Sequence, residues 1–415
     1  DGEPRLKDIR DGVEQRLARV PKLRQRLHRP GPLAGRPAWV DDPMFDIRDH
    51  VRVARVPAPG TTADLLDTAT AAYDALLDRR RPLWELWLLV GMPDGTVGVL
   101  LKLHHAVADG MAAVAVMAAL FDRAPHADVE PAPEGSPLAL PGYWAMAREN
   151  LASRGEVLRR GASALVRNPA AAAARAPRLL RTGRAYLART GAPASSLNQP
   201  VRPGRRVRFL TIDVGAVKNV AHAHGGRLND VVLGLWAAGL RALLASRGEP
   251  VAGVELVTAV AASLRDASGD GGVDNRTGAY VLPLPIGEAD PDRRLARVVA
   301  TTSATKAGQR PAAVTGVLAS LAGTPFGRAY VARQRANNTM VTNVPGPPER
   351  RWFLGAPVRD VLPIIQLIGN VGLTLCAFSY AGHLSLVVTA DAAAFEDLDV
   401  LMRGMEREWT ALRLP

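Results

Sequence analysis

The sequence predicts an α/β fold made of two halves that a long helical connector joins. Strand-like and helix-like segments interleave in both halves, a proline-rich stretch and a basic stretch separate them, and no short repeat is evident. The chain has 415 residues, of which 47% are apolar, so it can bury large cores. We assign residues 1–125 to the first half, 126–200 to the connector and 201–415 to the second half.

The first half reads as helix, loop, helix, two strands and helix. Apolar spacing predicts a helix over residues 5–27 and another over residues 61–80. The apolar runs at residues 84–90 and 96–104 are typical of strands. A third apolar run, residues 111–120, fits a buried helix.

The connector is strongly basic. A proline-rich loop covers residues 131–141, and helical spacing follows to about residue 195, with a break at Pro169. Only Glu149 and Glu156 oppose ten arginines, which are Arg148, Arg154, Arg159, Arg160, Arg167, Arg175, Arg178, Arg181, Arg184 and Arg189. Leucines and valines lie between them, so the segment resembles a basic amphipathic helix that associates with a membrane or lipid droplet. A solvated linker whose leucines pack on the protein is the equal alternative.

The second half also alternates strands and helices. Strands are expected at residues 206–213, 254–260 and 340–344, and a hairpin at residues 371–380 and 383–390 around Ala381-Gly382. Helices are expected at residues 229–246, 291–310 and 395–412. Asn229 is the expected N-cap of the first of these helices.

The most informative motif is His104-His105-Ala106-Val107-Ala108-Asp109-Gly110, between a predicted strand and a predicted helix. A histidine at a strand end can accept a proton near neutral pH, a nearby carboxylate can orient it, and a glycine N–H can stabilise an oxyanion. Adjacent strand residues point to opposite faces, so only one histidine faces a given cleft without a bend. A metal site and a purely structural role remain alternatives.

The motif resembles that of the CoA-dependent acyltransferase superfamily, which has the chloramphenicol acetyltransferase-like fold. Four further blocks, in family order, resemble the bacterial wax ester synthase/diacylglycerol acyltransferases. They are Pro82-Leu83-Trp84-Glu85, Leu228-Asn229-Asp230-Val231-Val232-Leu233, Ser263-Leu264-Arg265 and Thr342-Asn343-Val344-Pro345-Gly346-Pro347. The resemblance implies a two-lobed α/β sandwich with a tunnel between the lobes. Because family members normally begin with a short strand and loop, we expect an initial segment to be missing here.

The resemblance also implies a reaction, in which a long-chain acyl group passes from acyl-CoA to diacylglycerol or a fatty alcohol. His105 matches the general base of the family motif, and His104 would support the site from the other face of the strand. Asp109 would orient the loop, with Arg265 as a possible ion-pair partner, and the N–H of Gly110 would face the oxyanion. No covalent acyl-enzyme is expected, and the Gly-x-Ser-x-Gly nucleophile motif is absent.

The other blocks supply candidate substrate-binding residues. These are Pro82, Leu83, Trp84, Asn229, Asp230, Ser263, Arg265, Thr342 and Asn343. Core packing is an equal explanation for Trp84, helix capping for Asn229 and Asp230, and a strand-ending turn for Thr342 and Asn343. Arg350 and Arg351 are weaker candidates for contact with CoA phosphates.

Bulk properties narrow the partners. A net charge of +12 favours an anionic partner, but 5% aromatic residues and the lack of zinc-finger or RNP-like patterns argue against nucleic acid. We expect no metal and no cofactor, with acyl-CoA as co-substrate. No transmembrane helix is predicted, and the single cysteine, Cys376, suits the cytosol and a buried position. We therefore expect a cytoplasmic enzyme held peripherally at a membrane or lipid droplet.

Two competing functions remain. One is a carrier-protein-dependent condensation or polyketide-associated acyltransferase with the same histidine motif. The three blocks other than Leu228–Leu233 argue against it. The other is a non-enzymatic lipid-surface protein, which an intact His-His-x-x-x-Asp-Gly motif disfavours.

Overall fold

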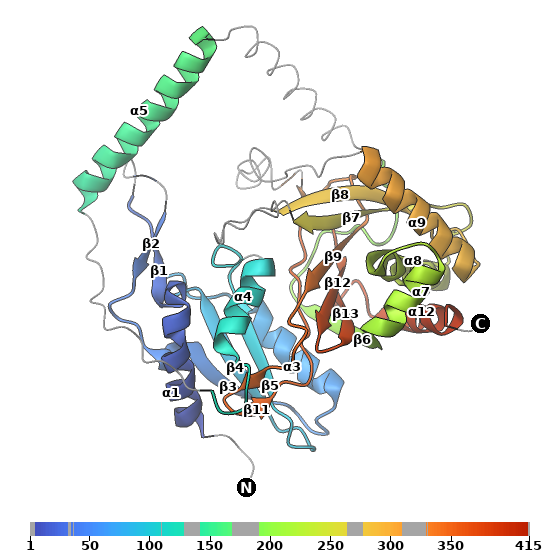
Figure 1. Ribbon diagram of the computed structural model, residues 1–415, viewed down its shortest axis with the longest axis horizontal. Coiled ribbons are helices and arrows are strands. Elements are labelled where there is room, and N and C mark those ends of the chain that lie inside the picture. Colours follow the sequence, from blue (N-terminus) through green and yellow to red (C-terminus); the bar gives the residue numbers. More distant parts are fainter. Residues whose placement is uncertain are drawn as a thin grey trace.

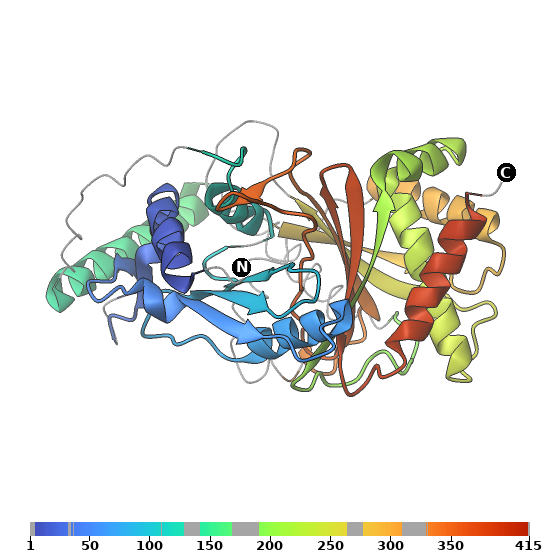
Figure 2. The same cartoon turned by 90° about the horizontal axis from the view of Figure 1, so that it is seen from below.

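The computed structural model arranges the chain as two lobes, each built on one β-sheet (Figures 1 and 2). It describes residues 5–31, 35, 37–108, 110–127, 142–167, 191–263, 277–308, 329 and 331–413. The proline-rich loop predicted at residues 131–141 lies outside the described residues, as do residues 168–190 of the basic connector.

The first lobe contains a three-stranded sheet in the order β3-β4-β5. The strands are β3 (Val51–Arg55), β4 (Trp84–Val90) and β5 (Gly98–Leu103). β3 and β4 are parallel, whereas β4 and β5 are antiparallel. Nearly every residue of β4 is buried, because both faces of this sheet are covered.

Two helices cover opposite faces of this sheet (Figure 2). Alternate residues of β4, such as Leu86 and Leu88, share a core with α4 (Gly110–Leu120). Leu89 points the other way, toward α3 (Thr62–Asp74).

The second lobe contains a six-stranded mixed sheet in the order β6-β13-β12-β9-β7-β8. Its strands are β6 (Arg205–Asp213), β7 (Leu256–Ser263), β8 (Thr277–Leu284), β9 (Thr339–Pro345), β12 (Leu373–Tyr380) and β13 (His383–Asp391). Its helices are α7 (Val214–Ala223), α8 (Leu228–Ser246), α9 (Pro291–Gly308) and α12 (Leu398–Ala411). The predicted hairpin is confirmed, and its turn uses positive φ angles at Ala381 (47°) and Gly382 (86°).

α8 is the one helix among the described residues that is long and apolar enough to cross a membrane. It is also mostly buried, with residues such as Trp236 and Leu240 fully enclosed in the core of the second lobe. Cys376, on β12 of the six-stranded sheet, is buried as predicted. Burial raises the pKa of its thiol to about 12.

The two lobes share side chains. Phe353, Phe378 and Tyr380 of the second half belong to the core of the first lobe. Phe353 comes from a small hairpin of β10 (Trp352–Phe353) and β11 (Ala356–Pro357), which lies against the first lobe. In the other direction, Leu66 of α3 packs with Val207 and Val387 of the large sheet.

Several predicted elements have different bounds. The helix expected over residues 5–27 ends early as α1 (Leu6–Arg16), because Pro21 cannot continue its hydrogen bonds, and two 3-10 turns follow. Residues 25–28 form β1 (Gln25–His28), which pairs with β2 (Ala38–Asp41).

The helix expected over residues 61–80 ends at Asp74 in α3. The buried ammonium group of Lys102 on β5 donates to the carbonyl oxygens of Ala72 (2.9 Å) and Ala75, which stabilises this helix end. The residues after Ala75 are therefore free to form a loop that carries Arg79.

Within the connector, α5 (Tyr143–Arg167) is a continuous helix. It extends past the β1–β2 hairpin, away from both sheets (Figure 1).

A buried histidine supports the start of β4. His50, at the end of α2 (Ile47–His50), stacks between Phe45 and Trp84, with ring centroids 5.1 and 4.6 Å away. Its Nδ1 donates to the carbonyl oxygen of Trp84 at 2.8 Å. Burial lowers the pKa of His50 below its ordinary value of 6.5, so the folded protein holds this ring neutral.

We predict that His50 makes folding stability dependent on pH. Its contribution is complete above pH 6.5 and declines as pH falls toward the lowered folded pKa, because the unfolded chain binds the proton first. His50→Phe keeps the stacking but leaves the Trp84 carbonyl unsatisfied, which costs about 1–3 kcal/mol at pH 8. Urea unfolding at pH 8 and pH 5.5 should show a smaller difference between variant and wild type at the lower pH. An equal difference at both pH values would contradict this role.

Candidate active site

The predicted histidine motif forms a tight turn between β5 and α4. The N–H of His104 donates to the carbonyl oxygen of Leu83 (3.0 Å), and the carbonyl of His104 accepts from the N–H groups of Val107 (2.8 Å) and Ala108 (3.4 Å). Val107 and Ala108 are buried in the core, whereas His104, His105 and Ala106 are exposed. The apolar half of the motif therefore anchors the turn, and the two imidazoles lie at the surface.

The ring of His104 has a defined hydrogen-bonding state. Its Nδ1 accepts the N–H of Ala106 at 3.1 Å, so in the neutral ring the proton is on Nε2. Partial burial, the guanidinium of Arg79 and the neighbouring His105 lower the pKa of His104 below its ordinary value. His104 is therefore a neutral hydrogen-bond donor at neutral pH.

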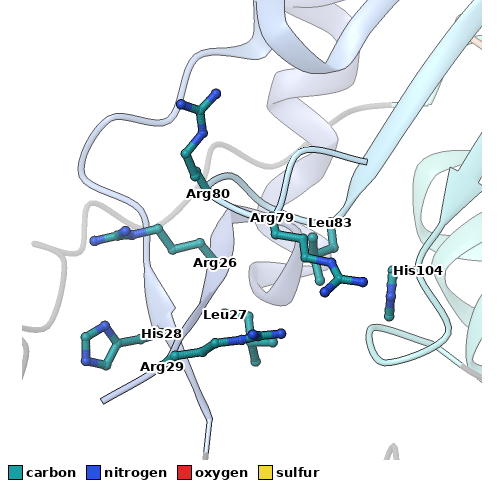
Figure 3. Close-up of a pocket in the computed structure, with 8 residues that line it drawn as sticks. All are labelled: Arg26, Leu27, His28, Arg29, Arg79, Arg80, Leu83 and His104. Carbon is teal, nitrogen blue, oxygen red and sulfur yellow. The ribbon is translucent and has the colours of Figure 1, made fainter. Parts of the chain in front are cut away.

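His104 lines a pocket of about 400 Å³ between the β1–β2 hairpin and the loop before β4 (Figure 3). The lining residues are Arg26, Leu27, His28, Arg29, Arg79, Arg80, Leu83 and His104. Figure 3 shows the guanidinium groups of Arg29 and Arg79 extending toward the side on which His104 lies, while Arg26 and Arg80 point away. Of the residues predicted for the site, this pocket contains His104 and Leu83.

The arginines of this pocket were not among the predicted site residues. Arg26 and Arg79 fall within the helices predicted over residues 5–27 and 61–80, where an arginine is usually a solvated surface residue. The available signal was the run Arg79-Arg80-Arg81 directly before the Pro82-Leu83-Trp84 block.

Gly110 is the first residue of α4, so backbone N–H groups at the positive end of a helix dipole, including that of Gly110, follow the histidine turn. Such groups can stabilise a developing negative charge. Asp109 and Arg265 lie outside the described residues, and Ser263 is described only as the last residue of β7.

The Pro82-Leu83-Trp84 block is buried next to the histidine turn and supports it. Trp84 is 1% exposed, and its indole N–H donates to the carbonyl oxygen of Leu23 at 2.7 Å. It lies in the core because His50 and this carbonyl satisfy both its ring face and its polar atom. Pro82 and Leu83 are also buried, and of this block only Leu83 lines the pocket.

The Asn229-Asp230 block caps a helix. Asp230 is 3% exposed, and its carboxylate accepts from the N–H of Arg227 (2.7 Å) and the hydroxyl of Thr302 (2.8 Å). The N-cap of α8 is Arg227, two residues before the predicted Asn229, which is half-buried within the first turn, so the predicted cap is wrong. Both carboxylate oxygens of Asp230 therefore bind groups of the second lobe, which agrees with the capping alternative.

Thr342 and Asn343 are half-buried on β9, where the pairing with β7 has ended at Val341 and only β12 remains as a neighbour. The Pro-Gly-Pro turn follows. A Cβ atom on Gly346 would lie 2.3 Å from the carbonyl oxygen of Ser379, so only glycine fits there.

Arg350 is exposed, whereas Arg351 is 9% exposed and donates its backbone N–H to the hydroxyl of Tyr380 (2.8 Å). Neither belongs to the lining of the pocket beside His104.

Comparison with known proteins identifies a family for both halves. A model of the wax ester synthase/diacylglycerol acyltransferase catalytic domain matches residues 1–232, and a model of the C-terminal domain of the same family matches residues 273–413. A probable diacylglycerol O-acyltransferase of Mycobacterium tuberculosis is 31% identical over 403 residues, which cover 95% of this chain and 85% of the relative.

Two solved structures share the fold. The wax ester synthase/diacylglycerol acyltransferase from Marinobacter aquaeolei VT8 has a TM-score of 0.69 at 21% identity, over 99% of this chain and 91% of that chain. The starter condensation domain of rhizomide synthetase, solved with C8-CoA, has a TM-score of 0.54 at 15% identity, over 99% and 87%. The predicted two-lobed fold is confirmed. The chain belongs to the wax ester synthase/diacylglycerol acyltransferase family and is an acyltransferase.

Proposed function

We propose that this acyltransferase transfers a long-chain fatty acyl group from acyl-CoA to diacylglycerol, which gives triacylglycerol, and less readily to a long-chain alcohol, which gives a wax ester. The observation that carries the proposal is the exposed His104-His105 turn, beside a pocket, in a chain of this family. The name of the mycobacterial relative supports diacylglycerol as acceptor. The competing carrier-protein-dependent function is disfavoured because both family models describe lipid acyltransferases.

His105 acts as the general base in this proposal. His104 carries its proton on Nε2 because Nδ1 is engaged by Ala106, so it is poorly suited to accept another proton there. His105 removes the proton of the acceptor hydroxyl while the oxygen attacks the thioester carbon. The tetrahedral oxyanion is stabilised by the N–H of Gly110 at the start of α4. When the C–S bond breaks, His105 returns the proton to the thiolate of CoA, and no acyl-enzyme or bound cofactor is needed.

We further propose that α5 holds the enzyme at a cytoplasmic membrane or lipid-droplet surface. Trp144 is 80% exposed and Leu151 is 59% exposed, at a spacing that puts both on one side of the helix. The exposed Arg148 lies between them. Exposed apolar side chains combined with arginines are typical of helices that bind an anionic lipid surface, and no nucleic-acid partner is required to explain the charge.

Product analysis tests the reaction. Incubation of the full chain with labelled palmitoyl-CoA and either dioleoylglycerol or hexadecanol should give triacylglycerol as the main product and wax ester as the minor one. Thin-layer chromatography separates the two. Absence of both products would refute the proposed function, and a dominant wax ester would reverse the acceptor preference.

His105→Ala should lower kcat by about 10²- to 10⁴-fold, because proton removal from the attacking hydroxyl is lost. Circular dichroism should be unchanged, since the side chain is exposed. His126→Ala, which removes another exposed histidine, is the matched control and should retain wild-type turnover. Turnover of His105→Ala close to that of this control would exclude His105 as the base.

Replacing the apolar residues of α5 tests the lipid surface. Trp144→Ser/Leu151→Ser should reduce flotation with anionic vesicles by about fivefold or more, because the two most exposed apolar side chains among those that the structure describes on this helix are removed. Met44→Ser removes an 82% exposed apolar residue elsewhere and is the control. Equal flotation of both variants would favour a plain linker.

A further inference from the structure

We propose that Arg29 and Arg79, together with His104, form a phosphate-binding subsite next to the reacting centre, and that the enzyme acylates a hydroxyl-bearing lipid phosphate such as a monoacylglycerol phosphate. This would be a second acceptor class beside neutral diacylglycerol. The inference rests on the proposed function, because it takes His105 as the base.

The pocket beside His104 is strongly positive. Four of its lining residues are arginines, and none of the described residues that line it is acidic. Arg80 is paired with Asp78 at 2.8 Å, and Arg26 lies 3.8 Å from Asp42. Arg29 and Arg79 form no ion pair with the described part of the chain, and both extend toward the His104 side of the pocket (Figure 3). Two guanidinium groups in this arrangement suit the bidentate recognition of a phosphate.

The imidazole of His104 presents a hydrogen-bond donor. Because Ala106 holds its Nδ1, the ring presents an Nε2–H donor. The guanidinium of Arg79 is close enough to act on this imidazole electrostatically. A neutral N–H donor beside two cations complements the oxygens of an anion, whereas a neutral ester would leave the guanidinium charges uncompensated.

The ligand must carry its phosphate close to the hydroxyl that reacts. His105, the proposed base, does not line the pocket but is the next residue in the exposed turn, with its Cα about 3.8 Å from that of His104, so in this proposal an anion at His104 lies close to the reacting hydroxyl. The phosphates of CoA are separated from its thioester by the long pantetheine arm and do not fit this requirement. In a monoacylglycerol phosphate only a few bonds separate the free hydroxyl from the phosphate. Leu27 and Leu83 supply apolar wall for the adjoining glycerol and acyl carbons.

The same bonds form and break as in the reaction with a neutral acceptor. The hydroxyl oxygen of the lipid phosphate attacks the thioester carbon, the C–S bond breaks, and the hydroxyl proton passes through His105 to the CoA thiolate. The products are a diacylglycerol phosphate and CoA. The phosphate itself takes no part in bond making or breaking.

The experiment compares matched acceptors that differ only in the phosphate, 1-oleoylglycerol and 1-oleoylglycerol 3-phosphate, with palmitoyl-CoA as donor. The wild type should acylate both. Arg29→Ala/Arg79→Ala should lower the ratio of kcat/KM for the phosphate acceptor to kcat/KM for the neutral one at least tenfold. Arg403→Ala/Arg407→Ala removes the same charge from exposed positions on α12 and should leave the ratio at the wild-type value.

Binding without turnover gives an independent readout. Titration calorimetry with glycerol 3-phosphate should show binding that inorganic phosphate competes for more weakly and that Arg29→Ala/Arg79→Ala abolishes. Equal affinity for inorganic phosphate, an unchanged acceptor ratio, or a raised KM for palmitoyl-CoA with both acceptors would each overturn the inference. Esterification of neutral acceptors alone would also overturn it while leaving the proposed function intact, whereas no acyl transfer to any acceptor would refute both.

Discussion

The buried carboxylate of Asp122 connects the parts of the molecule on which the site depends. Asp122 lies just beyond the end of α4 and is 3% exposed. It pairs with the buried Arg16 of α1 and with Arg19 (3.1 Å). Its backbone exchanges two hydrogen bonds with Trp352 of the second half, at 2.8 and 3.0 Å. A buried charge without its partner is costly, by about 3–5 kcal/mol, so α1, α4 and the β10–β11 hairpin are held together at one point. The position of α4 in turn determines where the histidine turn ends.

The elements that the sequence analysis located correctly are those with a strong local pattern. The bounds of β4 match the prediction at both ends, because a short run that is apolar except for Glu85 is typical of a strand covered on both faces. The β12–β13 hairpin was also predicted, since alternation on both sides of Ala381-Gly382 leaves little choice of register. β1 was missed because Gln25–His28 is mostly polar and is a strand only through its pairing with β2. Tertiary pairing of this kind has no local signature.

In the candidate site, too, the parts with a local sequence pattern were predicted and the parts that depend on tertiary structure were not. The histidine motif was found because its residues are consecutive, whereas Arg29 and Arg79 are fifty positions apart in sequence and meet only through the fold. Two residues of the outlying blocks have structural roles of the kind that was the equal alternative for them. Trp84 fills the core under the histidine turn, and Asp230 caps α8 in the second lobe. Their chemistry is satisfied by neighbouring protein atoms, which a sequence does not reveal.

In the proposed mechanism, two identical side chains of the turn have different chemical roles. Adjacent histidines have the same intrinsic proton affinity, so any difference must come from their surroundings. Around His104, the N–H of Ala106 occupies one nitrogen, and partial burial, followed by the guanidinium of Arg79, opposes a positive charge on the ring. A base and a hydrogen-bond donor can therefore stand side by side at one pH without competing for the same proton. Arg79, which together with burial keeps His104 neutral, also adds positive charge to the side of the pocket on which His104 lies, so the protonation state of His104 and the proposed recognition of an anionic acceptor involve the same guanidinium.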